Sequence, residues 1–112
     1  MKMIQAIIRP SKVEDVKSAL DKAGYASLTT LEVKGRGRQK GITQTWRGEE
    51  YKVDMLPKVK VEIVVPDEKV DEAVELIRKA AHTGSIGDGK IFVLPVEKTI
   101  RIRTGETNGK AL

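Results

Sequence analysis

The stretch Lys58–Asp67, KVKVEIVVPD, decides the fold because apolar and charged residues alternate along it. An extended chain points successive side chains to opposite faces, so this alternation predicts a half-exposed β-strand. Pro66 closes the strand, and Asp67 is suited to cap a helix that follows. One face of the strand carries Val59, Val61, Ile63 and Val65, and the other carries Lys58, Lys60 and Glu62.

Two segments with apolar residues at helical spacing lie before and after this strand. The first begins at Ser11-Lys12-Val13-Glu14, a capping-box sequence in which the Ser and Glu side chains would satisfy free backbone N–H groups. Gly24 is placed to end this helix, and the second helix stops near Thr83-Gly84. The predicted apolar faces are Val13, Val16, Ala19, Leu20 and Ala23, then Val70, Ala73, Val74, Ile77 and Ala81.

Further apolar runs predict strands at Met3–Arg9, Ala26–Lys34 and Lys90–Val96, with a short one at Thr99–Thr104. The order strand, helix, strand, strand, helix, strand predicts an α+β, ferredoxin-like βαββαβ sandwich with both helices on one sheet face. The whole chain, 1–112, fits a single domain with a flexible tail at about 105–112. The uncovered sheet face would carry apolar residues such as Val93 and Leu94, which predicts an oligomer.

The composition excludes several classes of protein. The chain has no cysteine and a single histidine, His82, so disulfides, thiolate metal sites and a zinc-binding His pair are excluded. Only 4% of residues are aromatic, so stacking platforms for single-stranded nucleic acid are nearly absent. No apolar run reaches the roughly 20 residues of a membrane span, and no signal peptide is evident, so we expect a cytoplasmic protein.

The positive charge is unevenly placed. The chain has a net charge of +5, and residues 34–60, with eight basic and three acidic side chains, have that same excess. Such a charge suits small anions, nucleic acid or a membrane surface.

The segment Thr83–Lys90, TGSIGDGK, has the form of a phosphate cradle, in which glycines let backbone N–H groups point at an anion. It is not a Walker A loop, because Ile91 stands where Ser or Thr is required. A connection chosen only for its turns explains the local pattern equally well. Arg101 and Arg103 alternate onto one side of the last predicted strand, where they would hold a polyphosphate or simply face solvent.

The segment from Gly37 to Pro57 is about 20 residues long, which exceeds an ordinary connection and indicates a functional loop between the second and third strands of the sandwich. Trp46 and Arg47 lie in its outer part, and both residue types are enriched at interface anchors. The alternative is that Trp46 folds back onto the domain. No Ser/His/Asp set, cysteine or carboxylate pair in an apolar pocket indicates catalysis, so we do not expect an enzyme.

Four blocks resemble the PII nitrogen-regulatory signal proteins, the GlnB and GlnK group, essentially end to end. They are EVKGRGRQKG (32–41), VDMLPKVKVEIVVPD (53–67), TGSIGDGKIFVLPVE (83–97) and IRIRTGE (100–106). The resemblance implies a homotrimer whose intersubunit clefts bind ATP or ADP.

By this resemblance, each nucleotide site draws residues from several stretches of the chain. Arg101 and Arg103 would approach the phosphates from the neighbouring subunit. The base would be enclosed by Ile7, Thr29, Gly35 and Val64, and ribose and phosphates held by Gly37, Arg38, Gln39, Gly87, Asp88, Gly89 and Lys90. Family members also bind 2-oxoglutarate beside a magnesium ion on ATP, which implicates Gln39 near the metal and Gln39, Lys40, Gly41 and Lys58 at the dicarboxylate.

The long loop corresponds to the family's T-loop, about 37–57, whose tip enters ammonium transporters or contacts enzymes of nitrogen metabolism. Arg47 matches the residue that plugs the transporter pore, which would be the protein's only association with a membrane. Tyr51 matches the tyrosine that some members have uridylylated, although Trp46 and Glu49 depart from that site's usual form. The alternative is a basic RNA-binding module, which predicts an aromatic RNP1 strand, whereas the strand holding Phe92 offers one aromatic.

Overall fold

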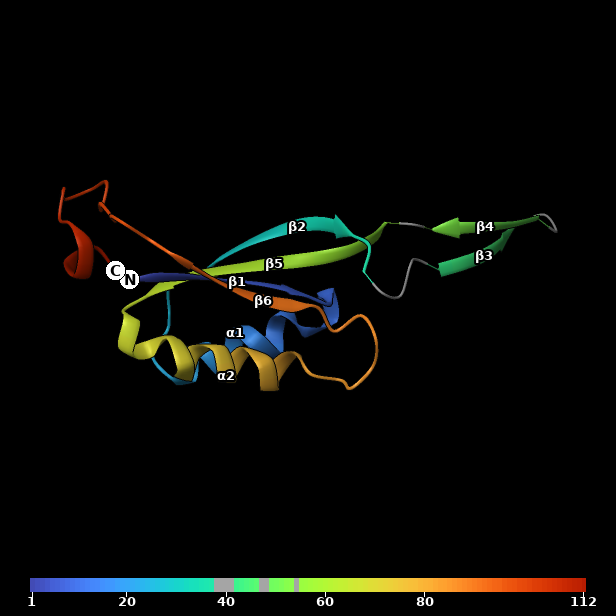
Figure 1. The fold of residues 1–112 in the computed structure, drawn as a ribbon, viewed down its shortest axis with the longest axis horizontal. Coiled ribbons are helices and arrows are strands. Elements are labelled where there is room, and N and C mark those ends of the chain that lie inside the picture. Colours follow the sequence, from blue (N-terminus) through green and yellow to red (C-terminus); the bar gives the residue numbers. More distant parts are fainter. Residues whose placement is uncertain (38–41, 47–48, 54) are drawn as a thin grey trace.

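The computed structural model describes residues 1–37, 42–46, 49–53 and 55–112 (Figure 1). The sandwich is formed by β1 (Lys2–Ile8), α1 (Val13–Lys22), β2 (Thr29–Gly35), β5 (Leu56–Val65), α2 (Val70–Ala81) and β6 (Lys90–Pro95). Between β2 and β5 lie β3 (Ile42–Trp46) and β4 (Glu49–Val53). Short 3₁₀ helices cover Pro10–Lys12, Asp67–Lys69 and Asn108–Ala111.

The main sheet is antiparallel, with four strands in the order β2-β5-β1-β6. Both helices pack on one face of this sheet (Figure 1). The register puts Ile4 of β1 opposite Ile63 of β5 and Val93 of β6, so these side chains share the helix-covered face. The predicted ferredoxin-like α+β sandwich is confirmed.

The core fills the space between the sheet and the helices. The alternation along β5 is confirmed, because its Val59, Val61, Ile63 and Val65 side chains are all buried. The helices contribute fewer buried residues than the strands. The largest fully buried side chains are Ile4, Ile8, Val16, Leu20, Val61 and Ile77, so the core is aliphatic.

The predicted helix starts are wrong in detail. Each α-helix is preceded by a 3₁₀ turn, and the N-cap positions are Lys12 and Lys69, with no side-chain cap hydrogen bond. Asp67 accepts a hydrogen bond from the Met1 ammonium group instead, at 2.9 Å. The prediction that Gly24 ends α1 is confirmed: its φ is 92°, and its N–H bonds the Asp21 carbonyl oxygen at 3.0 Å.

The segment expected to be an irregular loop contains a two-stranded antiparallel ribbon. Ile42 pairs with Val53, and Trp46 pairs with Glu49. The ribbon projects beyond the end of the main sheet (Figure 1). The chain thus runs out and back through paired strands, which no periodic pattern in the sequence had indicated.

The short strand predicted at Thr99–Thr104 is wrong. This part of the chain forms a turn with one isolated bridge, Ile100 to Thr107. The Asn108 N–H bonds the Thr99 carbonyl oxygen at 2.8 Å, which folds the tail back on itself. These contacts give the tail a local fold. Its flexibility stays a prediction.

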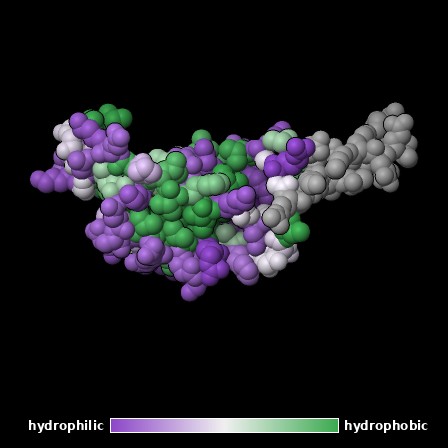
Figure 2. Space-filling model, in the orientation of Figure 1, coloured by the Kyte–Doolittle hydropathy of each residue, from purple (hydrophilic) through white to green (hydrophobic). Residues whose placement is uncertain are grey.

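The uncovered face of the sheet carries several apolar side chains, but one was misassigned. Adjacent residues of a strand face opposite sides, so Val93 and Leu94 cannot share a face. Leu94 lies opposite Met3 on the open face, whereas Val93 lies on the helix side at the β6 edge. Both are exposed, as is Phe92, and Figure 2 shows hydrophobic atoms gathered over the region of β6.

Candidate functional site

The connection from α2 to β6, residues 83–89, is shaped by its glycines. Gly84, Gly87 and Gly89 have φ values of 91°, 106° and 98°, a region that side chains rarely adopt. A Cβ atom added at Gly89 would lie 1.6 Å from the carbonyl oxygen of Ile7. The backbone of this segment, which we call the glycine loop, therefore lies directly against the end of β1 because residue 89 has no side chain.

The Asp88 carboxylate is held inside the glycine loop. It accepts hydrogen bonds from the Thr83 N–H at 2.8 Å, the Gly84 N–H at 2.9 Å, the Thr83 hydroxyl, and Arg9 Nε at 3.1 Å. These donors, the Thr83 hydroxyl foremost, hold the pKa of Asp88 well below its ordinary value. The carboxylate is thus ionised and fully bonded across the neutral pH range.

Two cations, one on β5 and one just after β1, also contact the glycine loop. Lys58 Nζ of β5 donates to the carbonyl oxygen of Gly87 at 2.8 Å, and Arg9 Nη2 donates to the carbonyl oxygen of Ile86 at 3.0 Å. Burial, and then the positive charge of Arg9, lowers the pKa of Lys58. An anion placed beside Lys58 would oppose this lowering of its pKa, so the local electrostatics favour an anionic ligand.

A cavity of about 390 Å³ opens between the glycine loop and the ends of β2 and β5. This volume is within the range of small-molecule sites. Three cations, Arg36, Lys58 and Lys90, line it with one acidic residue, Asp88. The cavity brings together the predicted residues Ile7, Gly35, Gly37, Lys58, Gly87, Asp88, Gly89 and Lys90.

The structure adds residues that the prediction did not name individually. Arg36, Ser85, Ile86 and Phe92 also line the cavity, and Ser85 and Ile86 lie within the predicted phosphate cradle, Thr83–Lys90. Arg9, which the sequence did not indicate, supports the cavity from the end of β1. The antiparallel pairing of β1 with β6, which puts Ile7 opposite Lys90, is the signal that would have found Arg9, since it puts the two strand ends together.

Four predicted residues are not brought to the cavity within one chain. Val64 lies four residues along β5 from Lys60, the residue opposite Ile7, a separation of about 13 Å. Thr29 lies opposite Glu62. Arg101 lies in the tail, where it contacts Glu106 at 3.3 Å, and Arg103 is exposed in the same turn.

Some predictions lie outside the described part of the chain. Arg38, Gln39, Lys40, Gly41 and Arg47 are not among the described residues, and for Trp46 and Tyr51 only the backbone pairing is described.

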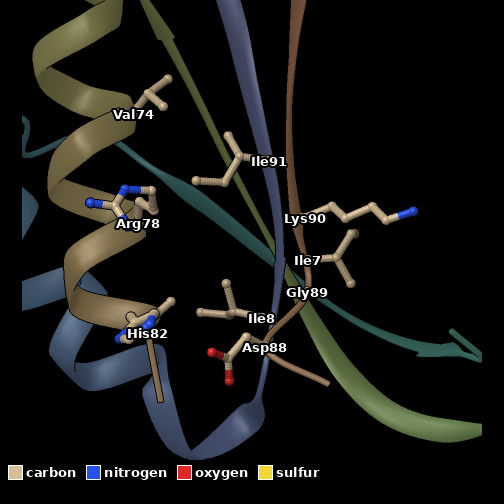
Figure 3. A pocket seen from close by; sticks show the side chains of 10 residues that line it. Ile7, Ile8, Val74, Arg78, His82, Asp88, Gly89, Lys90 and Ile91 are labelled. Carbon is tan, nitrogen blue, oxygen red and sulfur yellow. The ribbon is translucent and has the colours of Figure 1, made fainter. Parts of the chain in front are cut away.

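A second hollow, of about 300 Å³, lies between α2 and β6 (Figure 3). Its walls include the apolar side chains of Ile8, Val74 and Ile91. Arg78 at its rim is bonded to Glu75 at 2.9 Å and 2.6 Å, and Lys90 points away from the helix in Figure 3. The converging cations are therefore found at the larger cavity.

Among the residues that the structure describes, no three His, Asp or Glu side chains are grouped so that they could hold a metal ion. Of the helices described, none combines the length and the apolarity that crossing a bilayer requires.

Fold and cavity together define a ferredoxin-like domain with a cationic, glycine-lined cavity and a projecting β-ribbon. A family model described as "Nitrogen regulatory protein P-II" matches residues 1–106. The chain belongs to this family of nitrogen regulatory proteins, as the sequence motifs predicted.

Relatives from bacteria and archaea match the full length of the chain. The chain is 59% identical over 112 residues to nitrogen regulatory protein P-II 2 of Methanothermobacter thermautotrophicus, covering all of this chain and 97% of the relative. It is 58% identical to the nitrogen regulatory proteins P-II of Azospirillum brasilense and P-II 1 of Escherichia coli, with both chains of each pair fully covered over 112 residues.

The close approach at Gly89 generates a testable prediction. Replacing Gly89 with Ala adds a Cβ against the Ile7 carbonyl and strains a positive φ, so the loop must move or the protein must lose stability. We expect the free energy of unfolding, measured in urea, to fall by more than about 1 kcal/mol.

Gly109→Ala is the matched control, because nothing lies within 4 Å of an added Cβ there. Its free energy of unfolding should change by less than about 0.5 kcal/mol. Equal effects of the two substitutions would contradict the packing of the glycine loop against β1.

Proposed function

We propose that this protein senses ATP, ADP and 2-oxoglutarate and regulates nitrogen metabolism by binding a protein partner through its T-loop. The observation that carries the proposal is the convergence of Arg36, Lys58 and Lys90 on a cavity lined by glycine backbone. Backbone N–H groups and cations are the groups that hold phosphates in proteins. Membership in a nitrogen regulatory family supports the same conclusion.

The residues present fit the phosphates of a nucleotide. Gly87 and Gly89 bring backbone into the cavity without side chains, and Lys90 adds a charge from the first residue of β6. Ile7 and Phe92 supply apolar wall against which a base can pack. Gln39 is the side chain expected to help hold magnesium, which when bound would neutralise part of the phosphate charge.

Lys58 is the described residue best suited to a dicarboxylate. Its ammonium group is partly buried, so a carboxylate beside it would meet a cation in a region of reduced solvation. Gln39, Lys40 and Gly41 would complete the 2-oxoglutarate site. Because Lys58 also bonds the Gly87 carbonyl, it connects the effector site to the glycine loop.

Assembly into a homotrimer would complete the site. Thr29 and Val64 lie away from the cavity of their own chain, and Arg101 and Arg103 belong to the tail beyond β6. A cleft between two protomers would let such residues face the nucleotide. The exposed apolar residues of the open sheet face and tail, such as Leu94 and Ile102, would be covered in the same assembly.

Regulation would follow from the position of the β3–β4 ribbon. In sequence the ribbon follows β2 and precedes β5, the strands that bring Gly35 and Lys58 to the cavity. A ligand that binds one arrangement of the ribbon root more tightly than another would raise the population of that arrangement. A ligand with equal affinity for both arrangements would have no effect. The protein would act in the cytoplasm, without catalysis, on an ammonium transporter or an enzyme of nitrogen metabolism.

The nucleotide proposal is tested by isothermal titration calorimetry together with light scattering. We expect a trimer that binds ATP and ADP without hydrolysing ATP, and that binds 2-oxoglutarate only with ATP and magnesium. Lys58→Gln should abolish 2-oxoglutarate binding while weakening ADP no more than a few-fold. A monomer that gives no heat with either nucleotide would overturn the proposed function.

The partner proposal is tested by a pulldown with an ammonium transporter in detergent. Arg47→Ala should abolish capture and leave the calorimetric affinity for ADP unchanged, because the T-loop tip is expected to contact only the partner. Lys79→Ala, an exposed change on α2, is the control and should leave capture unchanged. Normal capture by Arg47→Ala would contradict the role of that residue.

A further inference from the structure

The Asp88 carboxylate has no acceptor position left for a ligand. Oδ1 accepts from Arg9 and from the Thr83 hydroxyl, and Oδ2 accepts from the N–H groups of Thr83 and Gly84. Two carboxylate oxygens offer about four acceptor positions in total. Asp88 thus lines the cavity while directing its charge into the glycine loop.

Arg9 joins the glycine loop to the sheet through two points. Nε bonds Asp88 at 3.1 Å and Nη2 bonds the Ile86 carbonyl at 3.0 Å, so one planar guanidinium holds both the side chain and the backbone of the loop. Arg9 directly follows β1, between that strand and the 3₁₀ turn that begins at Pro10. The side chains of Arg9 and Asp88 are 25% and 24% exposed, so this pair is better shielded than the surface pairs of the helices.

The charge balance of this pair matters for an anionic ligand. A bare carboxylate beside a phosphate would repel it, whereas Asp88 is neutralised by Arg9 and by two backbone dipoles. The same bonds fix the positions of Thr83 and Gly84 at the start of the loop. Lys58 and Lys90, which line the cavity directly, then supply the charge that faces the ligand.

We infer that Arg9 and Asp88 are positioning residues of the nucleotide site. Their ion pair, which we call the clasp, holds the glycine loop in the conformation that binds the nucleotide. The Asp88 side chain itself contacts neither ligand nor magnesium. The ligand part of this inference depends on the proposed function, whereas the clasp itself does not. The alternative assigns the Asp88 side chain to the ligand itself, as an acceptor for a hydroxyl or as a magnesium ligand.

The test compares Arg9→Gln, Asp88→Asn and the double variant with the wild type. ADP affinity is measured by calorimetry without magnesium, and ATP affinity with it. Each single variant loses a charge-assisted hydrogen bond that shapes the loop, so its affinity for ADP should be about tenfold lower. Because the two substitutions share the Arg9–Asp88 contact, the double variant should lose less ADP affinity than the sum of the losses in the two single variants.

Amide hydrogen exchange reports on the clasp directly. The Thr83 and Gly84 amides should exchange faster in both single variants, since their acceptor is the clasped carboxylate. Arg78→Gln is the matched control: it removes an exposed arginine–carboxylate pair on α2 and should change neither the exchange of these amides nor ADP affinity. Arg9→Lys keeps the charge but loses the two-point bonding of the guanidinium group. Its amide exchange rates and its ADP affinity should therefore lie between those of Arg9→Gln and the wild type.

Several outcomes would overturn the inference. A loss of affinity in Asp88→Asn that appears only with magnesium would make Asp88 a metal ligand, and additive losses in the double variant would make the two residues independent. Unchanged exchange at Thr83 and Gly84 would also refute the clasp. Because exchange is measured without ligand, it tests the clasp even if the wild type binds no nucleotide, a result that would refute the proposed function alone.

Discussion

The contact between the backbone of Gly89 and the end of β1 is the constraint on which the site depends. An added Cβ would lie 1.6 Å from the Ile7 carbonyl oxygen, so the chain reaches β6 by this path only with glycine at position 89. That path puts the glycine loop beside Arg9 and Lys58, which then bond its carbonyl and carboxylate oxygens. The contact of the Gly89 backbone with the end of β1 thereby determines where the glycine loop meets Arg9 and Lys58.

The charges around the loop divide into two groups with different roles. Arg9 and Asp88 neutralise each other inside the loop, while Arg36, Lys58 and Lys90 line the cavity. The excess of positive charge therefore faces the cavity, where an anionic ligand would bind. Under the proposed function, this cavity at the root of the projecting ribbon would connect ligand binding to the part of the molecule that reaches a partner.

The sequence predicted the sandwich because each element carries its own signal. The alternation in β5 and the helical spacing of Ala73, Ile77 and Ala81 follow from burial on one face, and the structure buries those residues. The predicted side-chain caps were wrong because a 3₁₀ turn precedes each helix and no side-chain cap hydrogen bond forms. The strand at Thr99–Thr104 was wrong because a strand needs a partner, which one chain does not supply there.

The site was predicted only in part, because some of its residues come together only through strand pairing. Glycines and cations on the loop and strands are visible in sequence, but Arg9 becomes a site residue only when β1 and β6 pair. Adding ADP to the isotope-labelled protein and following its amide NMR signals tests the central claim most directly. We predict that the largest shifts fall on Gly84, Gly87 and Gly89; shifts confined to the α2–β6 hollow around Val74 and His82 would contradict the account.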